Sequence, residues 1–168
     1  TSSHCDWSSD VCSSDLIAAK AVAFREAADP SFADYARQIV ANASVLAGAL
    51  VGHGFRLVTG GTDNHLMVVD LRTFDADVTG AVAQTTLDRA GITLNKNTVP
   101  DDPRSPFVTS GVRIGTPSTT TQGMAEEEMV EIADLMARAL RGRDDDEVIS
   151  AVRADVNALC ARFPVYGG

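Results

Sequence analysis

The chain has 168 residues, a net charge of −9 and three cysteines. This length suits one ordinary domain with a hydrophobic core, not two large ones. The acidic balance argues against nucleic-acid partners because phosphates need a basic surface, and the sequence has neither an apolar run long enough for a bilayer nor the pattern of a secretory signal. We therefore expect a cytoplasmic protein that binds neither nucleic acid nor membranes.

Residues 1–16 differ in composition from the rest of the chain. They are rich in serine and aspartate and contain the near repeat Ser8–Val11 and Ser13–Leu16, without helical or strand periodicity. We expect this segment to lack regular structure, and we interpret it as a leader unrelated to the domain formed by residues 17–168. A flexible interaction tail is the alternative.

The three cysteines are Cys5, Cys12 and Cys160. Their odd number and the lack of a CxxC pair support neither a disulfide framework nor a zinc site. A metal site built from His4, Cys5 and Cys12 would lack a fourth ligand. Cys160 falls on the apolar side of a predicted helix, so we expect it in the core.

Two helices are predicted before residue 55. Helix formers fill residues 17–28 and end at Asp29-Pro30. Ser31 then caps a long amphipathic helix, which Gly52-His53-Gly54 terminates. Its apolar positions recur at three- and four-residue spacing: Phe32, Tyr35, Ile39, Ala43, Leu46 and Leu50.

Strands dominate the middle of the chain. In chain order they are predicted over residues 55–58, 65–71, 92–94 and 108–114. Gly60-Gly61 reads as the turn between the first two. Between the second and third, Thr79 caps a helix that Gly91 closes.

Two further helices are predicted over residues 124–140 and 147–162. The apolar side of the first comprises Met129, Ile132, Leu135, Met136 and Leu140. Asp144 and Glu147 have capping-box spacing for the second, and the acidic run 126–128 is the negative first turn that helices favour. The order of elements predicts an α+β fold in which helices cover one face of a small sheet.

The segment from Asn95 to Pro117 carries the main functional signal. Three of the six prolines lie in its first half, at Pro100, Pro103 and Pro106. Each proline fixes its own φ and pushes its predecessor toward extended geometry, so this half is a stiff loop. Stiff loops beside strands are suited to holding a ligand.

The strand after this loop presents one arginine. Val112 and Ile114 point to one face and Arg113 to the other, because side chains alternate along a strand. A guanidinium fixed in this way matches a carboxylate with two parallel hydrogen bonds. The alternative is a salt bridge to one of the acidic residues of the chain.

Several motifs occur in a fixed order along the chain. They are Gly60–His65, Asn95–Pro103, Ser105–Phe107, Ser110–Pro117 and Cys160–Tyr166. Together they resemble the C-terminal domain of serine hydroxymethyltransferase (glycine hydroxymethyltransferase), over about Ile17 to Tyr166. The resemblance implies the small C-terminal domain of a fold-type I pyridoxal-phosphate enzyme.

The resemblance also implies a reaction and its cofactors. Family members interconvert serine and glycine, with pyridoxal phosphate as cofactor and tetrahydrofolate as one-carbon carrier, and complete members form homodimers or larger assemblies. Their Schiff-base lysine stands in a Thr-His-Lys context, which neither Lys20 nor Lys96 has. We therefore expect the large pyridoxal-binding domain to be absent and this fragment, which then has no catalytic residue, to be inactive alone.

By resemblance, Arg113 binds the substrate carboxylate, in agreement with the strand argument. Asn97 and the segment Ser105, Pro106 and Phe107 correspond to the folate-binding part of the family. Asn97 in a local turn and Phe107 in the core are the structural alternatives. Asp63, Asn64 and His65 read as turn chemistry, so His65 is not assigned as an acid or base.

The sequence therefore predicts a fragment of glycine hydroxymethyltransferase that carries part of the serine, glycine and tetrahydrofolate sites. One alternative is a non-catalytic module that binds carboxylates or pterins. Another is the small domain of a different pyridoxal-dependent transferase.

Overall fold

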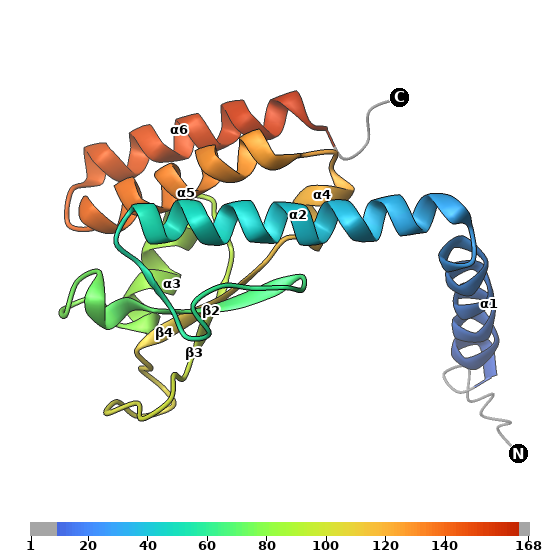
Figure 1. Ribbon diagram of the computed structural model, residues 1–168, viewed down its shortest axis with the longest axis horizontal. Helices are drawn as coiled ribbons and strands as arrows, with labels where there is room; N and C mark the ends of the chain where they lie inside the picture. Colours follow the sequence, from blue (N-terminus) through green and yellow to red (C-terminus); the bar gives the residue numbers. More distant parts are fainter. Residues whose placement is uncertain (1–9, 165–168) are drawn as a thin grey trace, which may run out of the picture. The chain divides into compact units, whose positions relative to one another are not determined.

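The computed structural model describes residues 10–164, with side chains from Asp15 onward (Figure 1). The chain forms two compact units, divided between Arg37 and Gln38. Each unit is described by itself.

The first unit comprises α1 (Asp10–Ala27) and the start of α2 (Pro30–Gly52). Helix α1 begins ahead of the predicted start at Ile17, so the expectation that residues 10–16 lack regular structure is wrong. Residues 1–9 lie outside the described part. From Asp15 onward, the large apolar side chains exposed in this unit are Leu16, Ile17, Val22, Phe24 and Phe32.

The residue that caps the N-terminus of α2 lies two positions earlier than the sequence predicts. Asp29, not Ser31, supplies the acceptor: its Oδ1 accepts hydrogen bonds from the Ser31 backbone N–H at 2.9 Å and from Ser31 Oγ at 2.6 Å. Pro30 then occupies the first helical position, where its missing N–H costs nothing. The Ser31 hydroxyl and N–H lower the pKa of Asp29.

The second unit is built on an antiparallel sheet of four strands in the order β1-β2-β4-β3. The strands are β1 (Arg56–Leu57), β2 (Leu66–Asp70), β3 (Asn95–Asn97) and β4 (Gly111–Gly115). The strand predicted over 92–94 is displaced to Asn95–Asn97. Its polar residues match no apolar strand pattern, and pairing with β4 determines its position.

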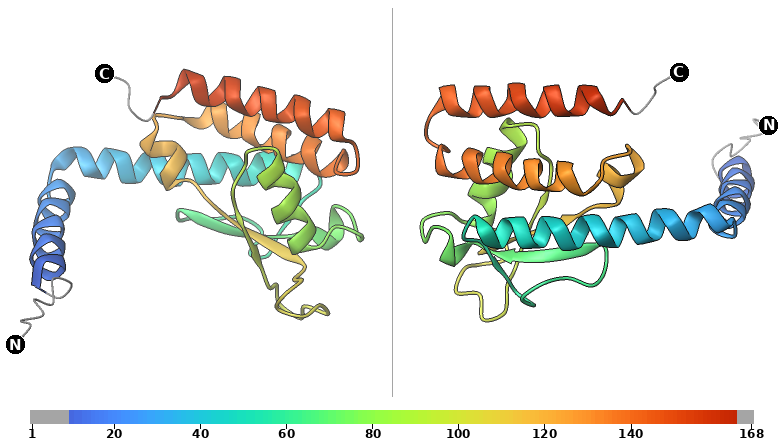
Figure 2. Two further views of the ribbon diagram at one scale, coloured as in Figure 1. Left: turned by 180° about the vertical axis from the view of Figure 1, so that it is seen from behind. Right: turned by 45° about the horizontal axis from the view of Figure 1, so that its top comes forward.

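The second unit also contains helices before, between and after its strands, beginning with the part of α2 from Gln38 onward. Beyond the 3₁₀ turn η1 (Leu71–Thr73) they are α3 (Gly80–Arg89), α4 (Pro117–Thr121), α5 (Glu126–Arg141) and α6 (Asp146–Arg162). Thr79 caps α3 as predicted, its Oγ1 accepting from the Val82 N–H. Asp145, not Asp144, caps α6 by accepting from the N–H groups of Glu147 and Val148. The short helix α4 was not predicted. Helices α5 and α6 lie side by side in both views of Figure 2.

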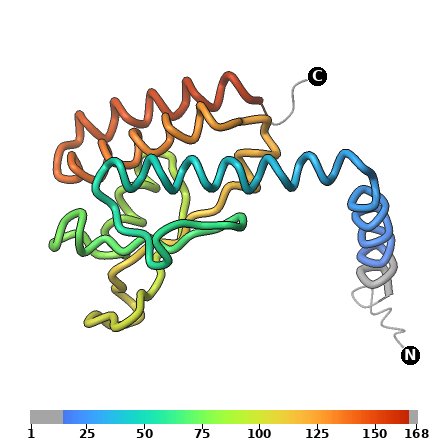
Figure 3. Tube along the Cα trace, viewed as in Figure 1, coloured from blue at the N-terminus to red at the C-terminus, as the bar shows by residue number. Residues whose placement is uncertain are grey.

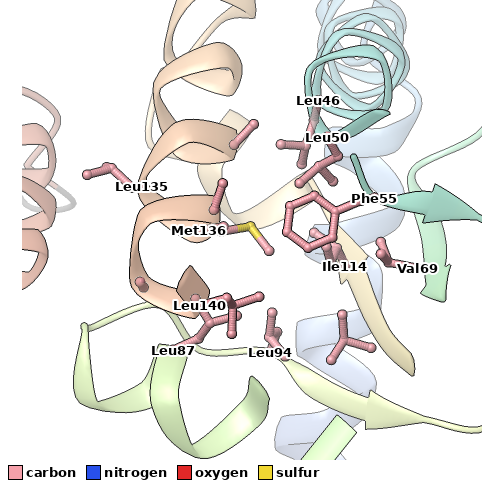
Figure 4. Close-up of a cluster of buried hydrophobic side chains, with 14 of the residues drawn as sticks. Leu46, Leu50, Phe55, Val69, Leu87, Leu94, Ile114, Leu135, Met136 and Leu140 are labelled. Carbon is pink, nitrogen blue, oxygen red and sulfur yellow. The ribbon is translucent and has the colours of Figure 1, made fainter. Parts of the chain in front are cut away.

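The hydrophobic core lies between the sheet and the helices. One cluster of this core contains Leu46 and Leu50 of α2 and Met136 of α5 (Figure 4). Phe55, which precedes β1, and Ile114 of β4 belong to the same cluster. The predicted apolar side of α5 is confirmed, since four of its five residues are buried and Ile132 is half-buried. The prediction for Cys160 is wrong: this residue is exposed, whereas its neighbour Leu159 takes the buried position on α6.

The two faces of the sheet differ in character. Met67 and Val69 of β2 and Val112 and Ile114 of β4 point toward the helices and are buried. The residues that alternate with them along the strands point to the other face, which we call the open face. On β2 and β4 these are Leu66, Val68, Asp70, Gly111, Arg113 and Gly115. The expected α+β fold, with helices on one face of a small sheet, is confirmed. Within residues 10–164, no helix has the length and apolarity needed to span a membrane.

Candidate functional site

Arg113 lies at the centre of the open face. It pairs with Val68 on β2 and Asn95 on β3, and its two alternate neighbours on β4 are Gly111 and Gly115. Two glycines leave the guanidinium without bulky neighbours along its own strand. Arg113 is exposed, while Val112 and Ile114 on either side are buried, so the predicted alternation is confirmed.

The Arg113 guanidinium has no partner among the described residues. No ion pair or hydrogen bond there involves its side chain, although most other arginines of this part bind a carboxylate or a carbonyl. The salt-bridge alternative from the sequence is therefore wrong for residues 10–164. An unpaired guanidinium on a rigid strand can accept an external carboxylate without first breaking a protein contact.

Two asparagines of β3 share the open face with Arg113. Asn95 lies directly opposite Arg113, and Asn97 lies opposite Gly111, one step along the same face. Asn97 Nδ2 donates to the Thr98 carbonyl at 2.7 Å, which orients the side chain and leaves its Oδ1 with no hydrogen bond among the described residues. The local-turn interpretation of Asn97 is thus correct for its donor only.

Lys96 lies between these asparagines and therefore points to the opposite face. Its N–H donates to Gln84 Oε1 of α3 at 2.9 Å, so a side chain covers this edge strand. Lys20 is exposed on α1, in the other unit. Because Lys96 and Arg113 lie on different faces, these residues do not fit a pyridoxal group bound as a Schiff base beside Arg113.

The proline loop, residues 98–110, connects β3 to β4 and projects beyond the sheet, away from α5 and α6 (Figure 3). Its first apolar residue, Val99, is buried against Gly111 of the open face. A Cβ on Gly111 would lie 2.6 Å from Val99 Cγ1 and 2.6 Å from the Val69 carbonyl oxygen. Glycine at this position therefore lets the loop rest directly on the sheet.

One carboxylate holds the proline loop together. Asp102 Oδ2 accepts from the N–H groups of Val99 at 3.2 Å and Ser110 at 2.9 Å. Its Oδ1 accepts from the Arg104 N–H at 3.0 Å and from Ser110 Oγ at 2.6 Å. Desolvation alone would raise the pKa of Asp102, but these hydrogen bonds outweigh it and lower the pKa to about 2.

Two arginines attach the loop to the segment after β2. Arg104 Nη2 donates to the Ala76 carbonyl at 2.7 Å. Arg72 Nη1 donates to the Asp101 carbonyl at 3.4 Å, while its Nη2 forms an ion pair of 2.7 Å with Asp70, which is 2 % exposed. The Arg72 hydrogen bonds lower the pKa of Asp70.

The tip of the loop is a tight turn. The Ser105 carbonyl accepts from the N–H groups of Val108 at 3.0 Å and Thr109 at 2.9 Å, so Pro106 and Phe107 lie at the turn's outer end. Phe107 is 85 % exposed, so the alternative that places it in the core is wrong. A large aromatic ring held in solvent is a candidate contact for a flat ligand.

The end of the loop is strained and closely packed. Thr109 is 2 % exposed and has a φ of 58°, a region that β-branched residues rarely adopt. A Cβ on Gly80, the first residue of α3, would lie 2.0 Å from Thr109 Oγ1 and 2.4 Å from the Gly111 carbonyl oxygen. The surrounding contacts therefore impose the backbone conformation at Thr109.

The residues before β2 form a turn, as predicted. Asn64 Oδ1 accepts from the Leu66 N–H at 2.9 Å, which is local turn chemistry. Asp63 and His65 are exposed, and the His65 carbonyl accepts from the Thr116 N–H. A cavity of about 500 Å³ is lined by His65, Asn95 and Arg113 and reaches the core side chains Leu46, Met129 and Met136.

The structure thus brings together some of the predicted residues. Asn97 and Arg113 share the open face, whereas Ser105, Pro106 and Phe107 lie at the loop tip, with no hydrogen bond to Arg113 in the described part. Sequence reasoning missed Asp102, although an aspartate two residues before an N–H donor, across a proline, is a signature of an Asx turn.

No group of three or more His, Cys, Asp or Glu residues suited to a metal occurs among the described residues. The side chains of His4, Cys5 and Cys12 lie outside that part.

A family model described as serine hydroxymethyltransferase matches residues 12–136, more than half of the chain. The match begins ahead of Ile17, inside the segment predicted to be a leader, and ends in α5. The leader and the resemblance of residues 137–166 therefore stay predictions.

Proposed function

The chain belongs to the serine hydroxymethyltransferase family, and we propose that its open face and proline loop form the substrate- and folate-binding half of a glycine hydroxymethyltransferase site. The observation that carries the proposal is Arg113, a guanidinium without a partner in the described part, fixed on β4 beside a rigid loop. The family match favours this function over the small domain of another pyridoxal-dependent transferase.

Arg113 binds the carboxylate of serine or glycine in this proposal. Its fork donates two parallel hydrogen bonds, which fix both the position and the orientation of the amino acid. Strand pairing on both sides of β4 prevents the Arg113 backbone from moving when the ligand binds. Such positioning lowers a reaction barrier by removing the freedom of the reacting groups in advance.

The proline loop contacts tetrahydrofolate. Phe107 supplies an exposed aromatic face for the flat pterin, and Asn97 Oδ1 is an acceptor for its polar edge. Ser105 and Pro106 hold the turn that carries Phe107. We assign these four residues to the folate site.

Pyridoxal phosphate, the cofactor that the family implies, supplies the electron sink of the reaction when bound. The residues described here do not hold it, because Lys96 lies on the other face of the sheet. In this proposal the Schiff-base lysine belongs to the pyridoxal-binding domain of the family, and the chain alone does not interconvert serine and glycine.

The test is a titration of the ¹⁵N-labelled chain, followed by NMR. Serine and glycine are each expected to shift the Arg113 Nε resonance, and ethanolamine, which is serine without its carboxylate, is the matched control for serine and should not. 5-Formyltetrahydrofolate, a stable folate analogue, is expected to shift the Asn97 and Phe107 amides. Glycine and ethanolamine acting alike would remove Arg113 from the site.

A second experiment examines the lysines. The chain is incubated with pyridoxal phosphate and reduced with borohydride, and peptides are mapped by mass spectrometry. We expect no stoichiometric adduct at one site. Stoichiometric labelling of Lys96 would show that this chain carries its own Schiff-base lysine.

A further inference from the structure

Asp102 has no role in the proposed function so far, yet its carboxylate is the most heavily hydrogen-bonded side chain of the loop. Its four donors come from three places: Val99 at the start of the loop, Arg104 in the middle and Ser110 at the end. A single side chain therefore links both ends of the loop and its centre.

The loop needs such an acceptor because of its own sequence. Pro100, Pro103 and Pro106 have no N–H, so the loop cannot close through a regular backbone ladder. The N–H groups of Val99 and Ser110 would otherwise be left without partners in buried positions, since Ser110 is 0 % and Val99 6 % exposed. Asp102 replaces the missing ladder.

We propose that Asp102 is a positioning residue that holds the proline loop in the conformation that binds folate, without touching the folate itself. This inference rests on the proposed function, because it concerns the same loop. Asp102 acts through Ser110, which leads into β4, and through Val99, which packs on Gly111. Asp102 thereby holds the loop in a defined position relative to β4, the strand that carries Arg113.

An ionised carboxylate is the group that this place requires. All four partners are donors, and a carboxylate offers acceptors on both oxygens. The NH2 group of an asparagine cannot accept from a backbone N–H, so Asp102→Asn breaks at least one of the backbone contacts and removes the charge with almost no change in shape. Arg104 Nη1 lies 3.3 Å from Ser110 Oγ and supplies a compensating positive charge nearby.

The control variant is Asp101→Asn. It removes the same charge at the adjacent, exposed position, where the contact to Arg72 uses the backbone carbonyl and not the side chain. Asp101 has a φ of 53°, which asparagine tolerates well. Any difference between the two variants therefore comes from the hydrogen bonds of Asp102.

The experiment compares the ¹⁵N-labelled wild-type chain with both variants by NMR. In Asp102→Asn we expect amide exchange at Val99 and Ser110 to be at least about tenfold faster and the affinity for 5-formyltetrahydrofolate about tenfold lower. The glycine-induced shift of Arg113 should be unchanged. Asp101→Asn should match the wild type in all three measurements.

A loss of folate-analogue affinity with unchanged glycine binding separates a positioning role from general destabilisation, because destabilisation would weaken the binding of both ligands. Unchanged exchange and unchanged analogue affinity in Asp102→Asn, with normal binding by the wild type, would overturn the inference and leave the proposed function standing. Absence of analogue binding by the wild type would instead overturn the folate part of the proposed function and, with it, the folate role of Asp102.

A second variant covers the case in which Asp102→Asn fails to fold, as judged from exchange at Met67 and Val112. Ser110→Ala removes the hydroxyl that donates to Asp102 and accepts from Arg104 Nη1, and it keeps the backbone contact to Asp102. We expect a severalfold loss of analogue affinity with no change for glycine. An affinity equal to that of the wild type would overturn the inference.

Discussion

The two faces of the sheet come from the same strands but have opposite characters. One face carries Met67, Val69, Val112 and Ile114, all at most 9 % exposed, and packs against the helices. The open face carries Asn95, Asn97 and Arg113, with Gly111 and Gly115 on either side of Arg113 along β4 and Val68 opposite it on β2. The packed face therefore excludes water from its side chains, whereas the open face leaves the Arg113 guanidinium exposed and without a partner among the described residues.

The largest expected effect is on the packed side. Leu50→Ala leaves a cavity where Leu50 meets Phe55 and Ile114, and we expect the free energy of unfolding to fall by about 2–5 kcal/mol. Val51→Ala, at the exposed next residue, is the control and should change it by less than about 1 kcal/mol. Urea unfolding of both variants measures the difference. Equal effects would mean that the core is not where the structure places it.

The next effect is at the junction between α3 and the proline loop. Gly80→Ala forces a Cβ onto Thr109 and Gly111 and should cost about 1–3 kcal/mol of unfolding free energy. Gly48→Ala, in α2 with no atom within 4 Å of the new Cβ, should instead stabilise by about 0.5–1 kcal/mol. Thermal unfolding measures the change in unfolding free energy of each variant. Changes of opposite sign would confirm the close contact at Gly80, and changes of the same sign would contradict it.

The loop should also respond to pH. The pKa of Asp102 is lowered from 3.8 to about 2 in the folded protein, so its stabilisation is complete above about pH 5 and is lost as the pH falls through about 2. The charged groups around it are Asp70, Arg72, Asp101 and Arg104.

The NMR chemical shift of the Val99 amide, followed from about pH 5 to about pH 1.5, should titrate with a midpoint near 2, because Val99 donates to the carboxylate of Asp102, whose pKa is about 2. Asp102→Asn should remove this transition. A midpoint near the ordinary carboxyl value would show that the four hydrogen bonds are not formed in solution.

The smallest effect on stability is expected at the loop tip. Phe107→Ala removes an 85 % exposed ring and should change the unfolding free energy by less than about 0.5 kcal/mol. Loss of the stacking surface should lower the affinity for 5-formyltetrahydrofolate by about 1 kcal/mol, roughly fivefold. Phe24→Ala, on the similarly exposed ring in α1, is the control. Calorimetric titration that finds the two variants equal would remove Phe107 from the folate site.

The sequence predicted the packed face well because burial leaves a periodic trace. The alternation around Arg113 and the spacing along α5 both report which side chains the core excludes from water. Polar strands leave no such trace, which is why β3 was placed at 92–94 instead of Asn95–Asn97. The exposed position of Cys160, one residue from buried Leu159, shows that a helix phase inferred without a partner is easily shifted by one position.

Within the candidate site, the exposed position of Arg113 was predictable from strand alternation, but the contacts around it were not. The folate role of Phe107 rests on a resemblance and stays a prediction. Asp102 depends on three donors spread between Val99 and Ser110, and the need for glycine at Gly111 depends on where Val99 packs. Such contacts form only when the loop folds onto the strand, so local patterns do not contain them.

The most direct test of the central claim uses a chimaera in which residues 17–168 complete the pyridoxal-binding domain of a family member and restore serine cleavage. Arg113→Ala should raise the serine KM and reduce kcat/KM roughly tenfold to a hundredfold, the cost of about 1.5–3 kcal/mol for a lost charged hydrogen-bond pair. Arg56→Ala, which removes an exposed arginine from the same face two strands away, should leave both parameters unchanged. Equal kinetics for the Arg113→Ala and parent chimaeras would contradict the assignment of the open face as the substrate-binding half of the site.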